Sequence, residues 1–246
     1  MCAIVAGAGV DLEYEERGTG AGVLLVHDMA GDAAAMLDAV PGVEATARLI
    51  AYSRRGYAGS GAPEPYAGTT VQEQAEDAAA VLRSLAPGGA ILAGAGFGAL
   101  IALDLLLRYP SLAPAAVLCD TPLLALVPDA ARALADQREE LEEAVRQGGP
   151  EAGVARWLDG RADSGRIERA QRSAGAFFAD YAGLASWPVT RRELRALGAP
   201  VVVLTGPATP PHVLAASDAL AALLPAATRR ADGDLAGAVG ELLARA

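Results

Sequence analysis

The sequence of 246 residues contains no lysine and no asparagine, and it has only two cysteines. Without lysine, no side-chain Schiff base can form with a carbonyl substrate or with pyridoxal phosphate, so that type of covalent catalysis is excluded. Cys2 stands near the N-terminus and Cys119 in an apolar run, which indicates neither a disulfide framework nor a metal site. We therefore expect the protein to use no metal and no cofactor.

A long apolar run and a surplus of positive charge are also lacking. Gly, Pro or charged residues interrupt every apolar stretch before the roughly 18 residues that span a bilayer. The first residues have neither the basic region nor the apolar region of a secretory signal. The net charge of −10 disfavours nucleic acid. We expect a cytoplasmic protein that binds a small molecule, and neither a membrane nor nucleic acid.

Short apolar runs alternate with longer helical patterns, which is typical of βαβ units around a mostly parallel sheet. Apolar runs predict strands at residues 23–26, 47–52, 90–93, 115–119 and 201–204. Helical periodicity predicts helices at residues 71–85, 97–109, 213–224 and from residue 235 onward.

Residues 123–195 differ from the rest of the chain because they are helical in pattern and rich in charge. We interpret them as a helical lid inserted into a core formed by residues 1–122 and 196–246. The insertion also carries large aromatic side chains. These residues line an apolar pocket or pack the lid onto the core: Trp157, Phe177, Phe178, Tyr181 and Trp187.

Three alternating glycines follow the predicted strand at 90–93. Gly94, Gly96 and Gly98 fit the strand, turn and helix layout of a nucleophile elbow, whose pattern is G-x-S-x-G. Glycine replaces serine at the centre, so the turn provides no Oγ nucleophile. The run also resembles the dinucleotide-binding pattern G-x-G-x-x-G, with Ala99 at its last position. The place of this turn, after two earlier strands, favours the elbow.

Several segments together resemble the α/β-hydrolase superfamily over nearly the whole chain. Residues 24–28 resemble the strand and His-Gly turn before the oxyanion loop, residues 52–61 resemble the D-x-R-G-x-G-x-S loop, and residues 197–206 resemble the strand before the catalytic acid. The resemblance implies an α/β-hydrolase fold: a mostly parallel central sheet flanked by helices, with a helical lid.

The family's catalytic triad is changed at all three positions in this chain. Gly96 replaces the serine, Thr209 stands where the acid is expected, and Asp234 stands closest to the histidine position. Because the Ser-acid-His relay needs all its members, we predict that the protein is not a serine hydrolase of the usual kind. Asp120 ends a strand where some members of the superfamily carry the acid, and we interpret it as structural.

The oxyanion hole consists of backbone N–H groups and does not depend on side-chain identity. By resemblance, its donors are the amides of Met29 and Phe97. His27, Asp28 and Asp234 are the candidate catalytic residues for proton transfer. Asp28 replaces the usual glycine, and its carboxylate would oppose an oxyanion unless it is protonated or turned away. The alternative is structural: His27 orients the loop, and the aspartates serve turns and caps.

Three functions remain open. The first is a cofactor-independent, non-hydrolytic enzyme of the cyclase, lyase or isomerase type, acting on a small apolar metabolite. The second is a protein that binds a small ligand without turnover. The third is a scaffold, because residues 27–28 and 94–99 also resemble the N-myc downstream-regulated proteins. We favour the first. His212, at a predicted helix start, is expected to be exposed.

Overall fold

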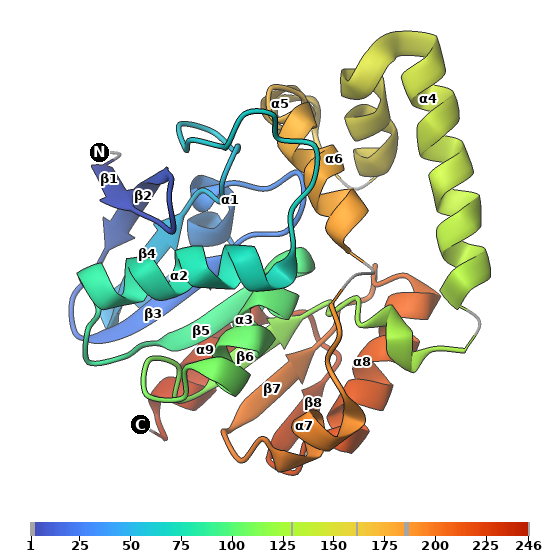
Figure 1. The fold of residues 1–246 in the computed structure, drawn as a ribbon. Coiled ribbons are helices and arrows are strands. Elements are labelled where there is room, and N and C mark those ends of the chain that lie inside the picture. The colour runs from blue at the N-terminus through green and yellow to red at the C-terminus, as the bar shows by residue number, and fades with distance from the viewer. Residues whose placement is uncertain (1–2, 129, 161, 185–186, 246) are drawn as a thin grey trace.

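In a computed structural model, the chain is described at residues 3–128, 130–160, 162–184 and 187–245. Over these residues one sheet has the strand order β1-β2-β4-β3-β5-β6-β7-β8. The pairs β1–β2 and β2–β4 are antiparallel, and every later pair is parallel. The predicted fold class, a mostly parallel sheet flanked by helices, is confirmed (Figure 1).

The strands are β1 (Ala3–Ala6), β2 (Asp11–Arg17), β3 (Ala21–Val26), β4 (Ala47–Tyr52), β5 (Ile91–Ala95), β6 (Ala116–Cys119), β7 (Val201–Leu204) and β8 (Ala227–Arg230). The predicted strands correspond to β3 through β7, with small differences at the ends. The sequence prediction missed β1, β2 and β8. These strands lie toward the two edges of the sheet, where one-sided burial does not require a continuous apolar run.

The helices are α1 (Ala33–Asp38), α2 (Val71–Leu85), α3 (Phe97–Arg108), α4 (Ala130–Leu158), α5 (Ser164–Gln171), α6 (Ala174–Gly183), α7 (Arg191–Ala196), α8 (Pro211–Leu223) and α9 (Leu235–Leu243). Short 3₁₀ turns lie at Val43–Ala45 and Leu124–Leu126. The predicted helices correspond to α2, α3, α8 and α9.

The sheet is buried on both faces, because successive side chains of a strand point to opposite sides. Leu24 and Val26 of β3 belong to the apolar cluster that includes α2 and α3, whereas Val23 and Leu25 belong to the cluster with α1 and α9. With both faces covered, the carboxyl ends of the parallel strands are the place where a site can form.

Helices α4, α5 and α6, which we call the cap helices, stand apart from the sheet (Figure 1). The backbone of α4 is non-helical at Gly148 and Gly149, where φ of Gly149 is +81°, and Pro150 follows directly. Glycine tolerates this left-handed φ, so the chain reverses here and α4 forms two arms. The predicted division of the chain at residues 123 and 195 stays a prediction.

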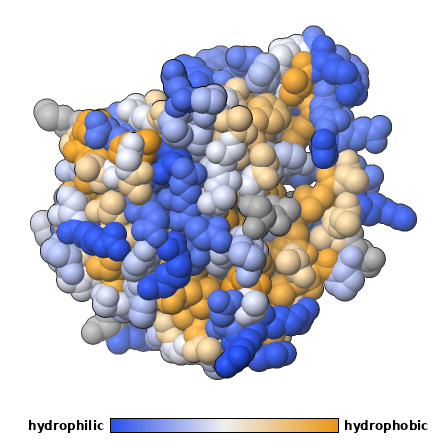
Figure 2. Space-filling model, in the orientation of Figure 1, coloured by the Kyte–Doolittle hydropathy of each residue, from blue (hydrophilic) through white to orange (hydrophobic). Residues whose placement is uncertain are grey.

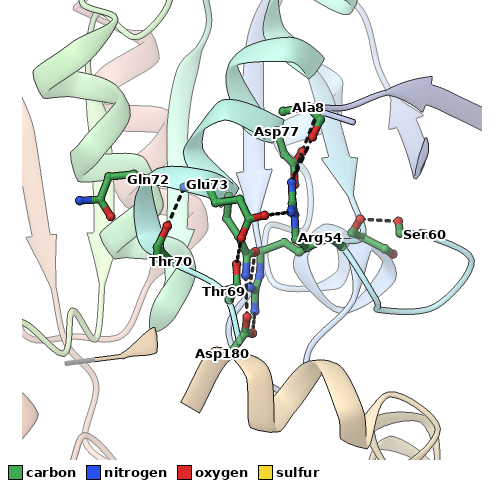
Figure 3. A network of polar contacts seen from close by, with 12 residues as sticks. Ala8, Arg54, Ser60, Thr69, Thr70, Gln72, Glu73, Asp77 and Asp180 are labelled. Carbon is green, nitrogen blue, oxygen red and sulfur yellow. Dashed lines mark hydrogen bonds and ion pairs between the residues drawn. The ribbon is translucent and has the colours of Figure 1, made fainter. Parts of the chain in front are cut away.

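A buried ion pair attaches α6 to the core. Arg54, in the loop after β4, bonds Asp180 of α6 at 2.6 Å, and neither side chain has any exposed area. Asp180 also accepts hydrogen bonds from Tyr57 and from Gln74 of α2, each at 2.6 Å. Figure 3 shows Arg54 and Asp180 facing each other between α2 and α6. Three parts of the chain therefore share one carboxylate.

Candidate functional site

The turn between β5 and α3 has the tight geometry that the glycine pattern predicts. Gly96 has φ +53° and ψ −119°, a conformation that strains any residue with a Cβ. A Cβ on Gly94 would lie 2.3 Å from the carbonyl oxygen of Gly98, and one on Gly98 would lie 2.2 Å from that of Val26. At positions 94 and 98 the neighbouring backbone is therefore too close for any residue but glycine.

The side chain of Asp28 fills the space beside Gly96. Asp28 follows β3, and its Oδ1 accepts a hydrogen bond from the backbone N–H of Phe97 at 2.7 Å. A Cβ built on Gly96 would lie 1.9 Å from Oδ1 and 2.0 Å from Cγ of Asp28. The carboxyl group thus occupies the position where a side chain of residue 96 would begin. It also bonds the Phe97 amide, one of the two predicted oxyanion donors.

Burial raises the pKa of Asp28 above its ordinary value. The backbone N–H groups of Phe97 and Met29 and the charge of Arg54 act in the opposite direction, because they favour the carboxylate, but burial is the largest cause. The second predicted oxyanion donor, the Met29 amide, therefore also acts on this carboxyl group. A carboxyl with a raised pKa can both hold and release a proton nearer neutrality.

The raised pKa predicts how stability depends on pH. The folded protein holds the Asp28 proton more tightly than the unfolded chain does. Protonation of Asp28 therefore contributes to the free energy of unfolding, and this contribution is complete below a pH of about 4 and is lost as the pH rises through the raised pKa. Asp28→Asn does not titrate at this position. As the pH rises from about 4 toward neutrality, the free energy of unfolding of Asp28→Asn is therefore expected to increase relative to that of the wild type. Urea unfolding at several pH values measures this difference.

The matched control is Asp136→Asn, because Asp136 is an exposed carboxylate on α4. Its free energy of unfolding should follow that of the wild type across the same range. A constant difference between Asp28→Asn and the wild type at all pH values would contradict the raised pKa.

His27 is buried, and the protein itself uses both of its ring nitrogens. Nε2 accepts the backbone N–H of Arg54 at 2.8 Å, so Nδ1 carries the hydrogen and donates to the Asp28 carbonyl oxygen at 2.7 Å. Burial, followed by the charge of Arg54, lowers the pKa of His27 well below its usual value. A neutral imidazole with two committed nitrogens favours the structural interpretation of His27: it orients the loop that carries Asp28.

A cavity of about 510 Å³ lies at the carboxyl ends of the central strands, under the cap helices. Its polar wall contains Asp28, Cys119, Asp120, Gln137, Arg166, Thr209 and His212. Its apolar wall contains Met29, Pro122, Leu124, Leu134, Trp157, Leu158, Leu184 and Val213. On the face drawn in Figure 2, the outer side of α4 is hydrophilic, and apolar residues gather beneath it toward the core.

Asp120 is a second carboxyl group in this cavity. Thr209 donates its hydroxyl to Oδ1 of Asp120 at 2.5 Å and accepts the backbone N–H of Gly206 at 2.8 Å. Burial raises the pKa of Asp120, although the Thr209 hydroxyl partly offsets this effect. Sequence reasoning assigned Asp120 a structural role. Its position at the end of β6, beside the elbow strand β5, is the signal that could have indicated a site residue.

Asp234 is not brought together with the other candidates. It caps α9, where its Oδ1 accepts the Gly237 N–H at 2.8 Å, and its exposed carboxylate pairs with Arg230 at 3.3 Å. Gly233, not Asp234, lies in the cavity wall. The geometry therefore gives Asp234 the capping role, which was the structural alternative for this residue.

The expectation that His212 is exposed was wrong. His212 is half-buried and lines the cavity, because α8 begins where β7 ends and its first turn faces the space under the cap helices. Cys119 also lines the cavity, but burial, followed by the charges of Asp120 and Asp28, raises its pKa to about 12. A thiol with this pKa stays protonated and is a poor nucleophile at neutral pH.

The five aromatic residues proposed for the pocket or lid have different positions. Trp157 lines the cavity. Phe178 packs edge-on against Phe177 with ring centroids 5.1 Å apart, and Tyr181 stacks on Phe177 at 6.4 Å. Trp187 donates its Nε1–H to Asp104 at 3.0 Å, away from the main cavity. Apart from Trp157, these residues pack the cap helices together or join the chain to the core.

Among the residues that the structure describes, no three His, Cys, Asp or Glu side chains are grouped so that they could hold a metal ion. No helix in the described ranges has the length and apolar character needed to cross a bilayer.

Together, these features define the class of protein. A mostly parallel sheet, a strained glycine turn between β5 and α3, and a cavity at the strand ends under the cap helices form an α/β-hydrolase fold. Residues 23–244 match the Alpha/beta hydrolase family. The chain belongs to this family, as the sequence resemblance implies.

Solved structures of similar fold include several hydrolases. An esterase from Thermogutta terrifontis is 23% identical with a TM-score of 0.77, and the match covers 100% of this chain and 98% of that one. An esterase from Exiguobacterium antarcticum is 15% identical with a TM-score of 0.80, covering 100% and 99%. The enol-lactonase from Burkholderia xenovorans LB400 is 18% identical with a TM-score of 0.62, covering 99% and 96%. These similarities show the shared fold.

One curated relative is similar over part of the chain. The uncharacterized hydrolase YraK of Bacillus subtilis (strain 168) is 31% identical over 102 residues, which are 42% of this chain and 38% of that protein. The matched region thus spans well under half of each protein.

Proposed function

We propose that the protein is a cofactor-independent, non-hydrolytic enzyme that moves a proton on a small, largely apolar substrate, with Asp28 as the acid–base group. Reactions of the isomerase, lyase or cyclase type need such a step. The observation that carries the proposal is the position of the Asp28 carboxyl: it lies beside Gly96, in the cavity wall, with its pKa raised by burial.

The same arrangement argues against covalent hydrolysis through the elbow. Gly96 has no hydroxyl, and Asp28 fills the space that a serine Cβ would need. Thr209 uses its hydroxyl to bond Asp120, and Asp234 caps a helix. No Ser-acid-His relay can therefore form at these positions.

Two carboxyl groups with raised pKa values in one cavity suit a proton transfer. Asp28 in its ionised form can take a proton from a C–H bond that a neighbouring carbonyl makes acidic. Asp120, when protonated, can supply a proton at another atom of the substrate, so the proton count balances without an oxidant or reductant. The apolar wall around Trp157 would hold the body of the substrate and exclude water.

The second candidate is a protein that binds a ligand without turnover. It is favoured by the bond between the Phe97 amide and Asp28, because this donor is satisfied within the protein itself and is not free for a developing oxyanion. The open cavity favours either of these functions over a scaffold, whose pocket we would expect to be filled by its own side chains.

Asp28→Asn is expected to reduce the proton-transfer rate by about 100-fold or more, the usual contribution of a general acid or base. The asparagine keeps the size and the oxygen that accepts the Phe97 N–H, but it cannot exchange a proton. The measurement is loss of C–H signals by NMR when a panel of small apolar carbonyl compounds is incubated with the protein in deuterated water.

The control for this measurement is Asp136→Asn, which removes an exposed carboxylate from α4 and should leave the exchange rate unchanged. Exchange at the wild-type rate in Asp28→Asn would refute the assignment of Asp28. Binding of panel compounds with no exchange in the wild type would instead support the second candidate.

A further inference from the structure

Arg166 in the cavity wall is half-buried, and one of its side-chain donors is buried without a hydrogen-bond partner. Arg166 of α5 lines the main cavity, and its Nε is buried with no hydrogen-bond partner. Within the described ranges, no carboxylate forms an ion pair with its guanidinium. A buried donor that makes no hydrogen bond costs roughly 1–3 kcal/mol, and more for a charged group. Packing of α5 alone gives no reason for this cost.

The next arginine on the same face of α5 behaves differently. Arg169 lies 3.6 Å from Asp32, in the loop that also carries Asp28. Because residues three apart lie on the same side of a helix, Arg166 is directed toward the same loop. Arg169 lines a second, smaller hollow and not the main cavity, whereas Arg166 lines both. Of these two arginines, Arg166 is the one that a ligand in the main cavity would meet.

The rest of the cavity limits what that ligand can be. The cap helices give the cavity an apolar wall that includes Trp157, Leu158 and Leu134. The volume of about 510 Å³ suits a small molecule. Asp28 and Asp120 also line the wall, at the strand ends, and would repel a ligand of high negative charge. A single negative charge on an apolar body fits these conditions.

We infer that the cavity binds an amphipathic monocarboxylate, with its carboxylate on the guanidinium of Arg166 and its apolar body along Trp157 toward Asp28. This inference rests on the proposed function, since it names the substrate class of the same site. Guanidinium and carboxylate are both planar and pair through two parallel hydrogen bonds, which a neutral head group cannot match. A phosphate monoester pairs with arginine as well, but it brings a second negative charge toward the two aspartates.

The test is isothermal titration calorimetry of the full chain with hexanoate, octanoate and decanoate, using octanamide and octyl phosphate as probes matched to octanoate. Octanoate is expected to bind about tenfold more tightly than octanamide, the scale of a charge-assisted pair, and more tightly than octyl phosphate. Arg166→Gln should abolish the preference for the acid over the amide, and Arg166→Lys should retain part of it.

Arg169→Gln is the matched control, because it removes an arginine from the same helix but not from the main cavity. It should keep the full preference for octanoate over octanamide. The inference is overturned if no acid of the series binds at millimolar concentration, if acid and amide bind equally, or if the preference survives Arg166→Gln. Tighter binding of octyl phosphate than of octanoate also overturns it.

The two proposals fail separately in these experiments. The alkanoates carry no reacting group, so their binding reports on Arg166 and not on catalysis. A preference for carboxylates without any proton exchange on the carbonyl panel would keep this inference and remove the proposed enzyme. Proton exchange that depends on Asp28, with no preference for carboxylates, would do the reverse.

Discussion

Asp180→Ala is expected to destabilise the protein by about 3–5 kcal/mol, the usual cost of removing one partner from a buried ion pair. Arg54 and Asp180 have no exposed side-chain area, and Asp180 also accepts hydrogen bonds from Tyr57 and Gln74. Without the carboxylate, the guanidinium of Arg54 stays buried and keeps hydrogen bonds only to the neutral oxygens of Gln74 and His27. The polar attachment of α6 to the core is lost at the same time, whereas the packing of Phe177 in the core remains.

The measurement is urea unfolding near neutral pH. Asp136→Ala removes an exposed aspartate from α4 and should change the free energy of unfolding by no more than about 0.5 kcal/mol. The double variant Arg54→Met with Asp180→Leu removes both charges and should recover part of the loss, because no buried charge then lacks a partner. A loss below about 1 kcal/mol in Asp180→Ala would show that the pair does not hold the cap helices as described.

Gly96→Ala is expected to cost about 3 kcal/mol or more, for two separate reasons. The positive φ of Gly96 strains any residue with a side chain, at about 1–3 kcal/mol. The new Cβ would also lie 1.9 Å from Oδ1 of Asp28, so the carboxyl must leave and lose its bond to the Phe97 N–H. The two causes can be separated experimentally.

In an Asp28→Ala background the clash disappears, and the cost of Gly96→Ala should fall by about 1–3 kcal/mol in a double-mutant cycle. Gly42→Ala is the control for a positive φ without a clash, because Gly42 has φ +81° and no heavy atom within 4 Å of a built Cβ. Urea unfolding of the wild type, the two single variants, the double variant and Gly42→Ala measures the cost of the clash and the cost of the positive φ. Additive effects of the Gly96 and Asp28 changes would contradict the contact between the two residues.

Much of the fold could be predicted because the central strands have to be apolar. The runs around Val23, Leu49 and Val202 are buried on both faces, so their patterns are continuous and easily recognised. The sequence of β2, with acidic residues at Asp11 and Glu13, and that of β8, with Arg229, give no such pattern. These strands form because they pair with neighbouring strands. The sequence pattern of one strand does not show that pairing, so it does not predict them.

The candidate site was predicted in part, and the missing part depends on distant contacts. The glycines around Gly96 and the candidate Asp28 could be located from motif spacing. The family resemblance placed Asp28 near the Phe97 amide. That its carboxyl bonds this amide and fills the space beside Gly96 could not be predicted, because the two residues are far apart in the chain and the pairing of β3 with β5 brings them together. The same holds for Arg166, whose role depends on where α5 lies over the loop near Asp32.

The contact between Asp28 and residue 96 also constrains the order in which this sequence can change. A serine introduced at position 96 alone meets the carboxyl group before it can act, so the substitution would be harmful whatever chemistry it offered. Asp28 has to be replaced first, and its replacement alone creates no nucleophile at position 96. A serine nucleophile at position 96 is therefore disfavoured in either order of single substitutions, because serine first meets the carboxyl group and loss of Asp28 first supplies no nucleophile.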